Sequence, residues 1–308
     1  MTIATAPKVT TLLAANLICM ASMVIWAAGL PSADHLIPLL PADQLNTLRT
    51  LSAAGALLPI WIACEGWRAL AVVNWPKGLL NGAFIGFGAW LLIEGQARSG
   101  AVTLAVISAM LPVVGITLEV LFDGRKLTLG LILGLILSLI GGVLALDIAG
   151  GGLSFGIGAL LCLASVVTFS IGSRLTVTAF PNQTALGRTT ISLTGAVLGA
   201  LSISLIKSWL GAAPPPSFAA WGFKEIGALF MFGVGSLGIA QLMFIMAVDR
   251  LGIGLSSIHI NASPFYVMLI LYALGGTWSW SQAAAAAIVG LGVLIAQGVI
   301  PLPFGRET

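Results

Sequence analysis

Charged residues are scarce in this chain of 308 residues, and their scarcity excludes an ordinary soluble fold. Asp, Glu, Lys and Arg make up 7% of the sequence, whereas soluble domains carry roughly 25%. The chain therefore lacks the polar surface that a water-soluble globule needs. Nucleic-acid binding is not indicated either, because the net charge is only +3 and the cations form no basic face.

Cysteine is also sparse. The three cysteines, Cys19, Cys64 and Cys162, lie far apart within apolar runs. No pair has the spacing of a metal site or a redox motif, and an odd number argues against a disulfide framework. We therefore expect no metal and no cofactor, and we interpret these side chains as small apolar filler.

Hydrophobic residues are abundant, at 58% of the sequence with a mean hydropathy of +1.08. About 20 apolar residues span the hydrocarbon core of a bilayer, and only hydrogen-bonded structures such as helices can cross it. The sequence predicts an all-α integral membrane protein with ten transmembrane helices. The expected spans are 11–30, 45–64, 77–97, 99–121, 127–147, 153–174, 185–206, 222–247, 252–274 and 282–300.

The loop cations predict how the chain is oriented. If the N-terminus is inside, nine cations fall on the inner side and four on the outer side. Because cytoplasmic loops carry the excess of Lys and Arg, we expect both termini in the cytoplasm. The first apolar run ends at Leu30 and is long for a cleaved signal sequence, so we interpret it as the first span of a bacterial-type inner-membrane protein.

An internal repeat divides the chain. An offset of 152 residues pairs Arg98 with Arg250 and Pro112 with Pro264, and a weaker offset of 139 pairs Arg49 with Arg188. Two five-helix repeats, 1–150 and 151–308, would then enter the membrane in opposite orientations around a central cavity. Such inverted repeats are typical of alternating-access transporters. The alternative is chance similarity among apolar helices.

Four stretches of the sequence resemble one known family. They are Ile25-Trp26-Ala27, Leu40-Pro41 with Leu45, Leu48 and Arg49, Gly100-Ala101 through Pro112, and Gly134 with Gly141-Gly142-Val143. Together they resemble the ten-helix EamA-type branch of the drug/metabolite transporter superfamily. Many members have Gly-Glu after the fourth and ninth helices, whereas this chain has Gly124-Arg125 and Gly276-Thr277. The run Leu121 to Lys126 is similar to the corresponding turn of the aromatic amino-acid exporters.

The resemblance implies a non-enzymatic exporter of small metabolites, with amino acids ahead of the alternatives. Those alternatives are a multidrug permease or a permease for sugars or nucleosides, and, from other classes, an intramembrane enzyme or a helical scaffold. The expected partners are a small-molecule substrate and membrane lipid. Facilitated diffusion and proton coupling stay open, as does the oligomeric state.

Polar residues at membrane depth indicate where a substrate path would run. The ninth span carries Gly252, Ser256, His259, Ser263 and Tyr266 on one helical face, which favours a cavity lining over a packing seam. Further cavity candidates lie on the first, third, sixth and eighth spans: Trp26, Trp90, Glu94, Ser165 and Gln241.

Alternatives accompany several of these candidates. Glu94 is either a proton or ammonium site or an interfacial partner of Arg98 at i, i+4. Pro112 and Pro264 each interrupt a span and are candidate hinges, with passive bending as the alternative. The run Gly233 to Gly238 fits G-x-G-x-x-G, but within an apolar helix it indicates close packing or a kink rather than a nucleotide site.

Overall fold

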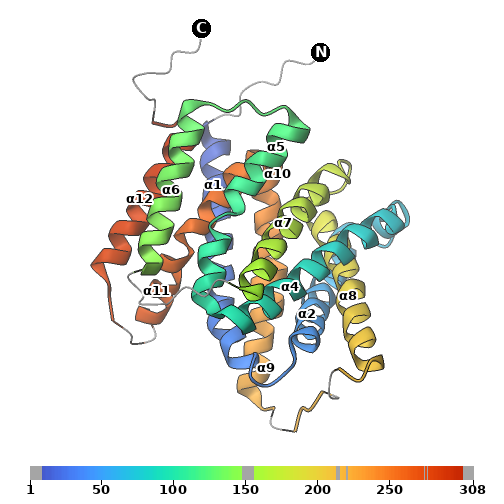
Figure 1. Ribbon diagram of the computed structural model, residues 1–308. Helices are drawn as coiled ribbons and strands as arrows, with labels where there is room; N and C mark the ends of the chain where they lie inside the picture. Colours follow the sequence, from blue (N-terminus) through green and yellow to red (C-terminus); the bar gives the residue numbers. More distant parts are fainter. Residues whose placement is uncertain are drawn as a thin grey trace.

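The computed structural model describes residues 9–147, 156–212, 216–219, 221–273, 275 and 277–300, and every regular element among them is a helix (Figure 1). Six of these segments are long and apolar enough to cross a membrane. The chain is therefore a multi-pass membrane protein.

The elements are α1 (Val9–Leu36), α2 (Ala42–Glu65), α3 (Arg68–Ala71), α4 (Trp75–Ser108), α5 (Leu111–Asp123), α6 (Leu129–Asp147), α7 (Ile157–Thr178), α8 (Ala185–Trp209), α9 (Phe223–Phe230), η1 (Met231–Ile239), α10 (Ala240–Ile258), η2 (His259–Ala262), α11 (Ser263–Ala273) and α12 (Trp280–Ala296).

The predicted spans map onto these helices with two kinds of exception. Shorter apolar helices, Leu129–Gly141 and Ala283–Ala296, lie at the predicted fifth and tenth spans. In the predicted fourth and ninth spans, α5 and α11 have 13 and 11 residues and supply only the C-terminal parts. The count of ten spans, the inverted repeat and the division at residue 150 stay predictions. The predicted boundary between residues 150 and 151 lies outside the described residues.

The first interruption falls later than the sequence predicted. Helix α4 continues through residue 98, where a boundary was expected, and Arg98 donates to Glu94 one turn earlier at 2.6 Å. The chain leaves the helix at Ala109 and Met110, just ahead of Pro112. A proline disfavours helical geometry in the residue before it and lacks an N–H to donate. Pro112 therefore lies in the first turn of α5, and its role as a hinge stays a prediction.

A glycine breaks the long helical segment of the second half. Gly252 has φ +81° and ψ 166° inside α10, a conformation that costs other residues free energy because of their Cβ. This break coincides with the predicted boundary between the eighth and ninth spans. Seven residues later, η2 is a short 3-10 turn that leads into α11, where Pro264 is the second residue.

The helices of one half pack mainly on helices of the other half. Helix α4 packs against α7 and α8, α6 against α12, α5 against α10, and α1 against η1 and α10 (Figure 1). One apolar core joins α1 to α10 through Ala15, Cys19, Met23, Phe244 and Ala247. At the centre of the molecule, a small space is lined mainly by α1, α4, α7, η1 and α10, with single residues from α2, α5 and η2.

One glycine allows a close approach at this centre. A Cβ at Gly233 would lie 1.8 Å from Ser52 Oγ and 3.0 Å from the carbonyl oxygen of Arg49. Only a residue without a side chain fits there, so η1 can lie directly against α2. The G-x-G-x-x-G run is thus a helix-packing feature, as expected, and its backbone is a π-helix.

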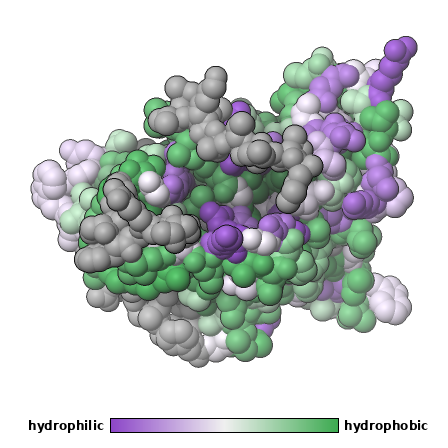
Figure 2. Space-filling model, turned by 90° about the horizontal axis from the view of Figure 1, so that it is seen from above, coloured by the Kyte–Doolittle hydropathy of each residue, from purple (hydrophilic) through white to green (hydrophobic). Residues whose placement is uncertain are grey.

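The end of the molecule where α1 begins and α5 leads into α6 is partly hydrophilic. Seen from that end, hydrophilic side chains gather near the centre and along one edge, and apolar side chains form much of the rest of the coloured surface (Figure 2). This distribution fits a protein whose flanks face lipid and whose ends face water.

Candidate functional site: a central cavity

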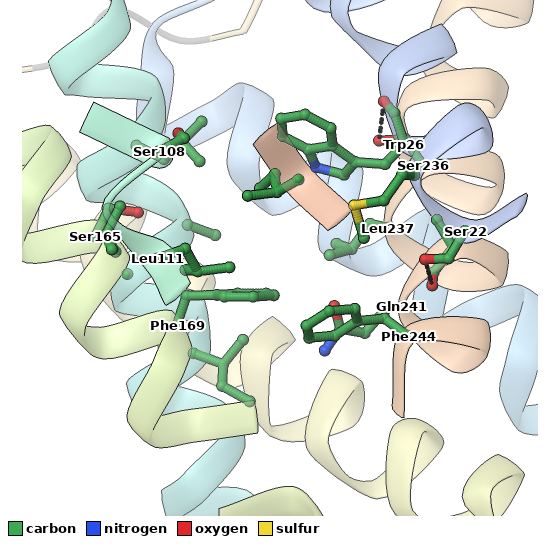
Figure 3. A pocket seen from close by; sticks show the side chains of 18 of the residues that line it. Ser22, Trp26, Ser108, Leu111, Ser165, Phe169, Ser236, Leu237, Gln241 and Phe244 are labelled. Atoms are coloured by element: carbon green, nitrogen blue, oxygen red, sulfur yellow. Dashed lines mark hydrogen bonds between the residues drawn. The ribbon is translucent and has the colours of Figure 1, made fainter. Parts of the chain in front are cut away.

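A small cavity lies between α4, α5 and α7 on one side and α1, η1 and α10 on the other. Its volume is about 90 Å³, and Trp26, Phe169 and Phe244 are the aromatic residues that line it. In Figure 3, Ser108, Leu111, Ser165 and Phe169 face it from one side, and Ser22, Trp26, Ser236, Gln241 and Phe244 from the other. Three of the sequence-predicted candidates, Trp26, Ser165 and Gln241, are therefore brought together here.

Two hydroxyl groups of this cavity join α1 to the neighbouring segment of η1 and α10. Ser22 donates to the carbonyl oxygen of Ala240 at 2.7 Å, and Ser236 donates to that of Trp26 at 3.3 Å. Both acceptors lie in helical segments, so these bonds fix one wall of the cavity. The wall includes the π-helix η1, a type of distortion that often occurs at functional sites.

Arg49 is a lining residue that the sequence analysis did not place at the site. Its side chain is only 5% exposed and lines the cavity. Its Nε donates to the carbonyl oxygen of Phe232 at 3.3 Å, and its guanidinium carbon lies 4.1 Å from the centre of the Phe232 ring. The available signal was an arginine within the second span, since cations inside a membrane are costly and mark functional sites.

The polar stripe of the ninth span is buried but lies away from this cavity. His259 and Tyr266 line a wider groove of about 660 Å³ between α1, η2, α11 and α12. Ser256 and Ser263 line neither space; they are 0% and 7% exposed. The 3-10 turn changes the helical period between Ser256 and Ser263, so the stripe is not one continuous face. The side chain of Pro264 lies outside the described part of the chain.

The remaining candidates lie together on α4, outside both spaces. Glu94 accepts from Arg98 at 2.6 Å, which is the ion-pair alternative considered above. Trp90 packs on Phe87 with 5.7 Å between ring centres. The structure thus does not bring Glu94 or Trp90 to the central cavity.

Glu119 is a buried carboxylate near the end of α5. It is 5% exposed, pairs with Arg125 and accepts from the backbone N–H of Gly254 at 3.0 Å. That N–H belongs to the first turn after the break at Gly252, where unpaired N–H groups attract a carboxylate. Glu119 therefore joins the end of α5 to the start of the ninth-span helix.

A second ion pair joins α5 to α7. Arg174 donates through Nε to Asp123 at 2.9 Å and through a second nitrogen to the other carboxylate oxygen. These hydrogen bonds hold the pKa of Asp123 below its ordinary value, although burial acts in the opposite direction. The carboxyl group is 40% exposed, so water screens the pair and its contribution is below about 1 kcal/mol.

Changing Asp123 to Asn should therefore lower the melting temperature slightly at neutral pH. Because the folded pKa is depressed, the stabilisation is present above the unfolded pKa of about 4 and is lost as the pH falls through the lower folded value. The difference between wild type and D123N should shrink below about pH 4. Melting curves of both proteins between pH 3 and 8 test this, and a constant difference would contradict it.

Comparisons with known proteins agree with this architecture. Residues 13–146 match the model of the EamA-like transporter family. No curated protein is similar to the chain in sequence. Among solved structures, one described only as "Crystal structure of protein" superposes with a TM-score of 0.75 and 20% identity, over 93% of this chain and 97% of that one. At that identity the likeness shows a shared fold.

The match over residues 13–146 and the membrane-spanning helices together suggest a membrane transporter of small molecules.

Proposed function

We propose that the protein exports small metabolites across a bacterial-type inner membrane, with amino acids as the first substrate class. The observation that carries the proposal is the central cavity, where an arginine, serines, a glutamine and aromatic rings converge between apolar helices. Ionisable residues within membrane spans are costly, so they usually face the interior of the helix bundle or a substrate path. Pockets of this composition bind small molecules by combining apolar contact with a few polar groups.

The packing of the helices supports an alternating-access mechanism with inverted repeats. If the two halves are related by a two-fold axis, the equivalent spans that lie beside the axis meet across it. Three such pairs pack together: α2 with α8 (spans two and seven), α5 with α10 (spans four and nine) and α6 with α12 (spans five and ten). The helix breaks correspond too, since adding the offset of 152 to residue 109 gives 261, inside η2.

Uptake by sealed vesicles that contain the purified protein tests the proposal. A panel of labelled amino acids, sugars and nucleosides should show saturable uptake of at least one amino acid above the level of protein-free vesicles. Uptake of sugars or nucleosides alone would reject the amino-acid assignment. No saturable uptake of any compound by folded protein would reject the transport function and favour an enzyme or a scaffold.

The proposed topology makes a separate prediction for two exposed positions. In a background without the exposed Cys64, a cysteine replacing Lys126 should react only with reagents that reach the cytoplasm. A cysteine replacing Pro216 should react from outside, because the chain crosses the membrane an odd number of times between the two positions. The neighbouring residues 213–215 lie outside the described part of the chain. Labelling of both positions from the same side would contradict the ten-span topology.

A further inference from the structure

We propose that Arg49 is the anchor for a carboxylate, and that the cavity selects small organic carboxylates with an apolar body. The proposal rests on the assignment of the central cavity as the substrate site and names the chemical group by which a substrate is recognised there.

Arg49 carries a positive charge within the helix bundle. The side chain is almost fully buried, and no Asp or Glu of the described residues forms an ion pair with it. Its one hydrogen bond within the described chain uses Nε, whereas a guanidinium carries five N–H donors in a planar fork. A carboxylate in the cavity would supply both the missing charge and acceptors in a matching geometry.

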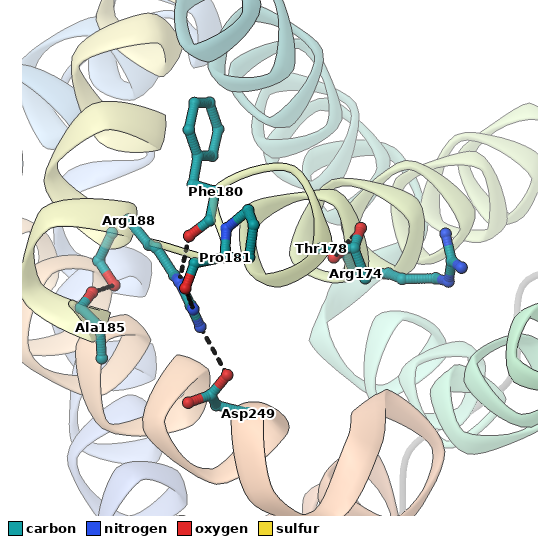
Figure 4. Close-up of polar contacts among 8 residues, drawn as sticks. Arg174, Thr178, Phe180, Pro181, Ala185, Arg188 and Asp249 are labelled. Carbon is teal, nitrogen blue, oxygen red and sulfur yellow. Dashed lines mark hydrogen bonds and ion pairs between the residues drawn. The ribbon is translucent and has the colours of Figure 1, made fainter. Parts of the chain in front are cut away.

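Arg188 lies 139 residues after Arg49, at the offset of the internal repeat. It is an example of a structural arginine in this fold. Arg188 donates to the carbonyl oxygens of Phe180 and Pro181 at 2.8 and 2.9 Å, and it pairs with Asp249 at 2.5 Å (Figure 4). Its charge is thus neutralised and its donors are distributed over three acceptors. Arg49 has no such set of partners in the described structure, although it is equally buried.

The rest of the lining defines what the carboxylate would be attached to. The lining residues include no Asp or Glu among the described positions, so an ammonium group would find no opposite charge there. Trp26, Phe169 and Phe244 offer ring surfaces to an apolar body, and about 90 Å³ of space limits its size. A phosphate dianion would leave a second negative charge without a partner in this apolar surrounding. The carboxylate is therefore the recognised group, whether or not an amino group accompanies it.

Binding to wild-type protein in lipid nanodiscs tests this selectivity without any transport step. Two probe series share one apolar body each: leucine, leucinamide, 4-methylpentanoate and 3-methylbutylamine, and the matching phenylalanine compounds. A ligand that binds only the folded state raises its melting temperature. In at least one series, the compounds with a free carboxylate should raise the melting temperature, whereas the amide, the amine and inorganic phosphate should not. An equal response to acid and amide, or no response to the acids in either series, would overturn the proposal.

Variants of Arg49 and Arg98 test whether carboxylate binding depends on Arg49. The variant R49Q should weaken carboxylate binding by about tenfold to a hundredfold, since a charge-assisted hydrogen bond is lost, and R49K should retain part of it. The control R98Q removes an exposed cation outside the cavity and should bind as wild type does. If R49Q does not fold, R49K and the wild-type probe series still decide the question. Unchanged carboxylate binding by folded R49Q would overturn the proposal, even if the wild-type protein transports amino acids. If the wild-type protein binds carboxylates selectively but transports no compound, the proposed function is rejected and the carboxylate site is retained.

Discussion

Replacing Ser165 by Trp should abolish transport while leaving a folded protein. Ser165 is 3% exposed and lies on α7 at the wall of the cavity opposite Trp26. An indole group would occupy the space of about 90 Å³ that the substrate needs. Some strain is expected, because overfilling a packed site costs about 1–3 kcal/mol. Initial uptake rates in vesicles should fall to the level of protein-free vesicles.

A matched control separates blockage from damage to the helix. Leu163 lies on the same helix and is 40% exposed, so L163W adds the same side chain on the outer surface. This variant should transport at close to the wild-type rate, and S165A should as well. If S165W transports normally while it is folded and reconstituted to the same level, the cavity is not the substrate path.

Replacing Gly233 by Leu should prevent the native packing of η1 on α2. The Cβ alone would overlap Ser52, and the carbonyl oxygen of Arg49 at 3.0 Å is backbone that cannot move independently. Overpacking against backbone is at the upper end of the usual cost of overfilling a core, so we expect the free energy of unfolding to fall by about 3 kcal/mol. Expression level and melting temperature in detergent measure the loss.

Gly227 supplies the control for this substitution. It lies six residues earlier, and a Cβ there would meet nothing within 4 Å. The variant G227L should therefore express and melt nearly as wild type does. A G233L protein with wild-type stability would show that η1 and α2 are not held at the close distance described.

The all-helical, multi-pass character of the fold was predictable because the membrane leaves few alternatives. Long apolar runs must be helical in lipid, and the glycine run from Gly233 to Gly238 indicated the close packing seen at Gly233. The candidate span Trp75–Ser99 ends close to the predicted boundary near residue 98, but the helix itself continues past it to Ser108. The interruption of the helix lies at Ala109 and Met110, just ahead of Pro112.

The site was less predictable because it depends on the π-helix η1 and the 3-10 turn η2. A regular helical periodicity in the sequence does not reveal such distortions. The ninth-span stripe assumed an uninterrupted α-helix, whereas η2 is a 3-10 turn and leaves only His259 and Tyr266 at a common groove. The π-helix η1 likewise determines which carbonyl oxygen faces Arg49. Residues from distant helices, such as Trp26, Ser165 and Gln241, could be proposed one by one. Their convergence required the tertiary structure.

Counterflow in sealed vesicles is the measurement that tests the central claim most directly. The claim is that one cavity takes up a small molecule and opens alternately to the two sides of the membrane. Vesicles loaded with an unlabelled transported amino acid should accumulate the labelled compound from outside transiently above its equilibrium level, and S165W should abolish this overshoot. Saturable uptake with no overshoot, or an overshoot that S165W leaves unchanged, would contradict the account.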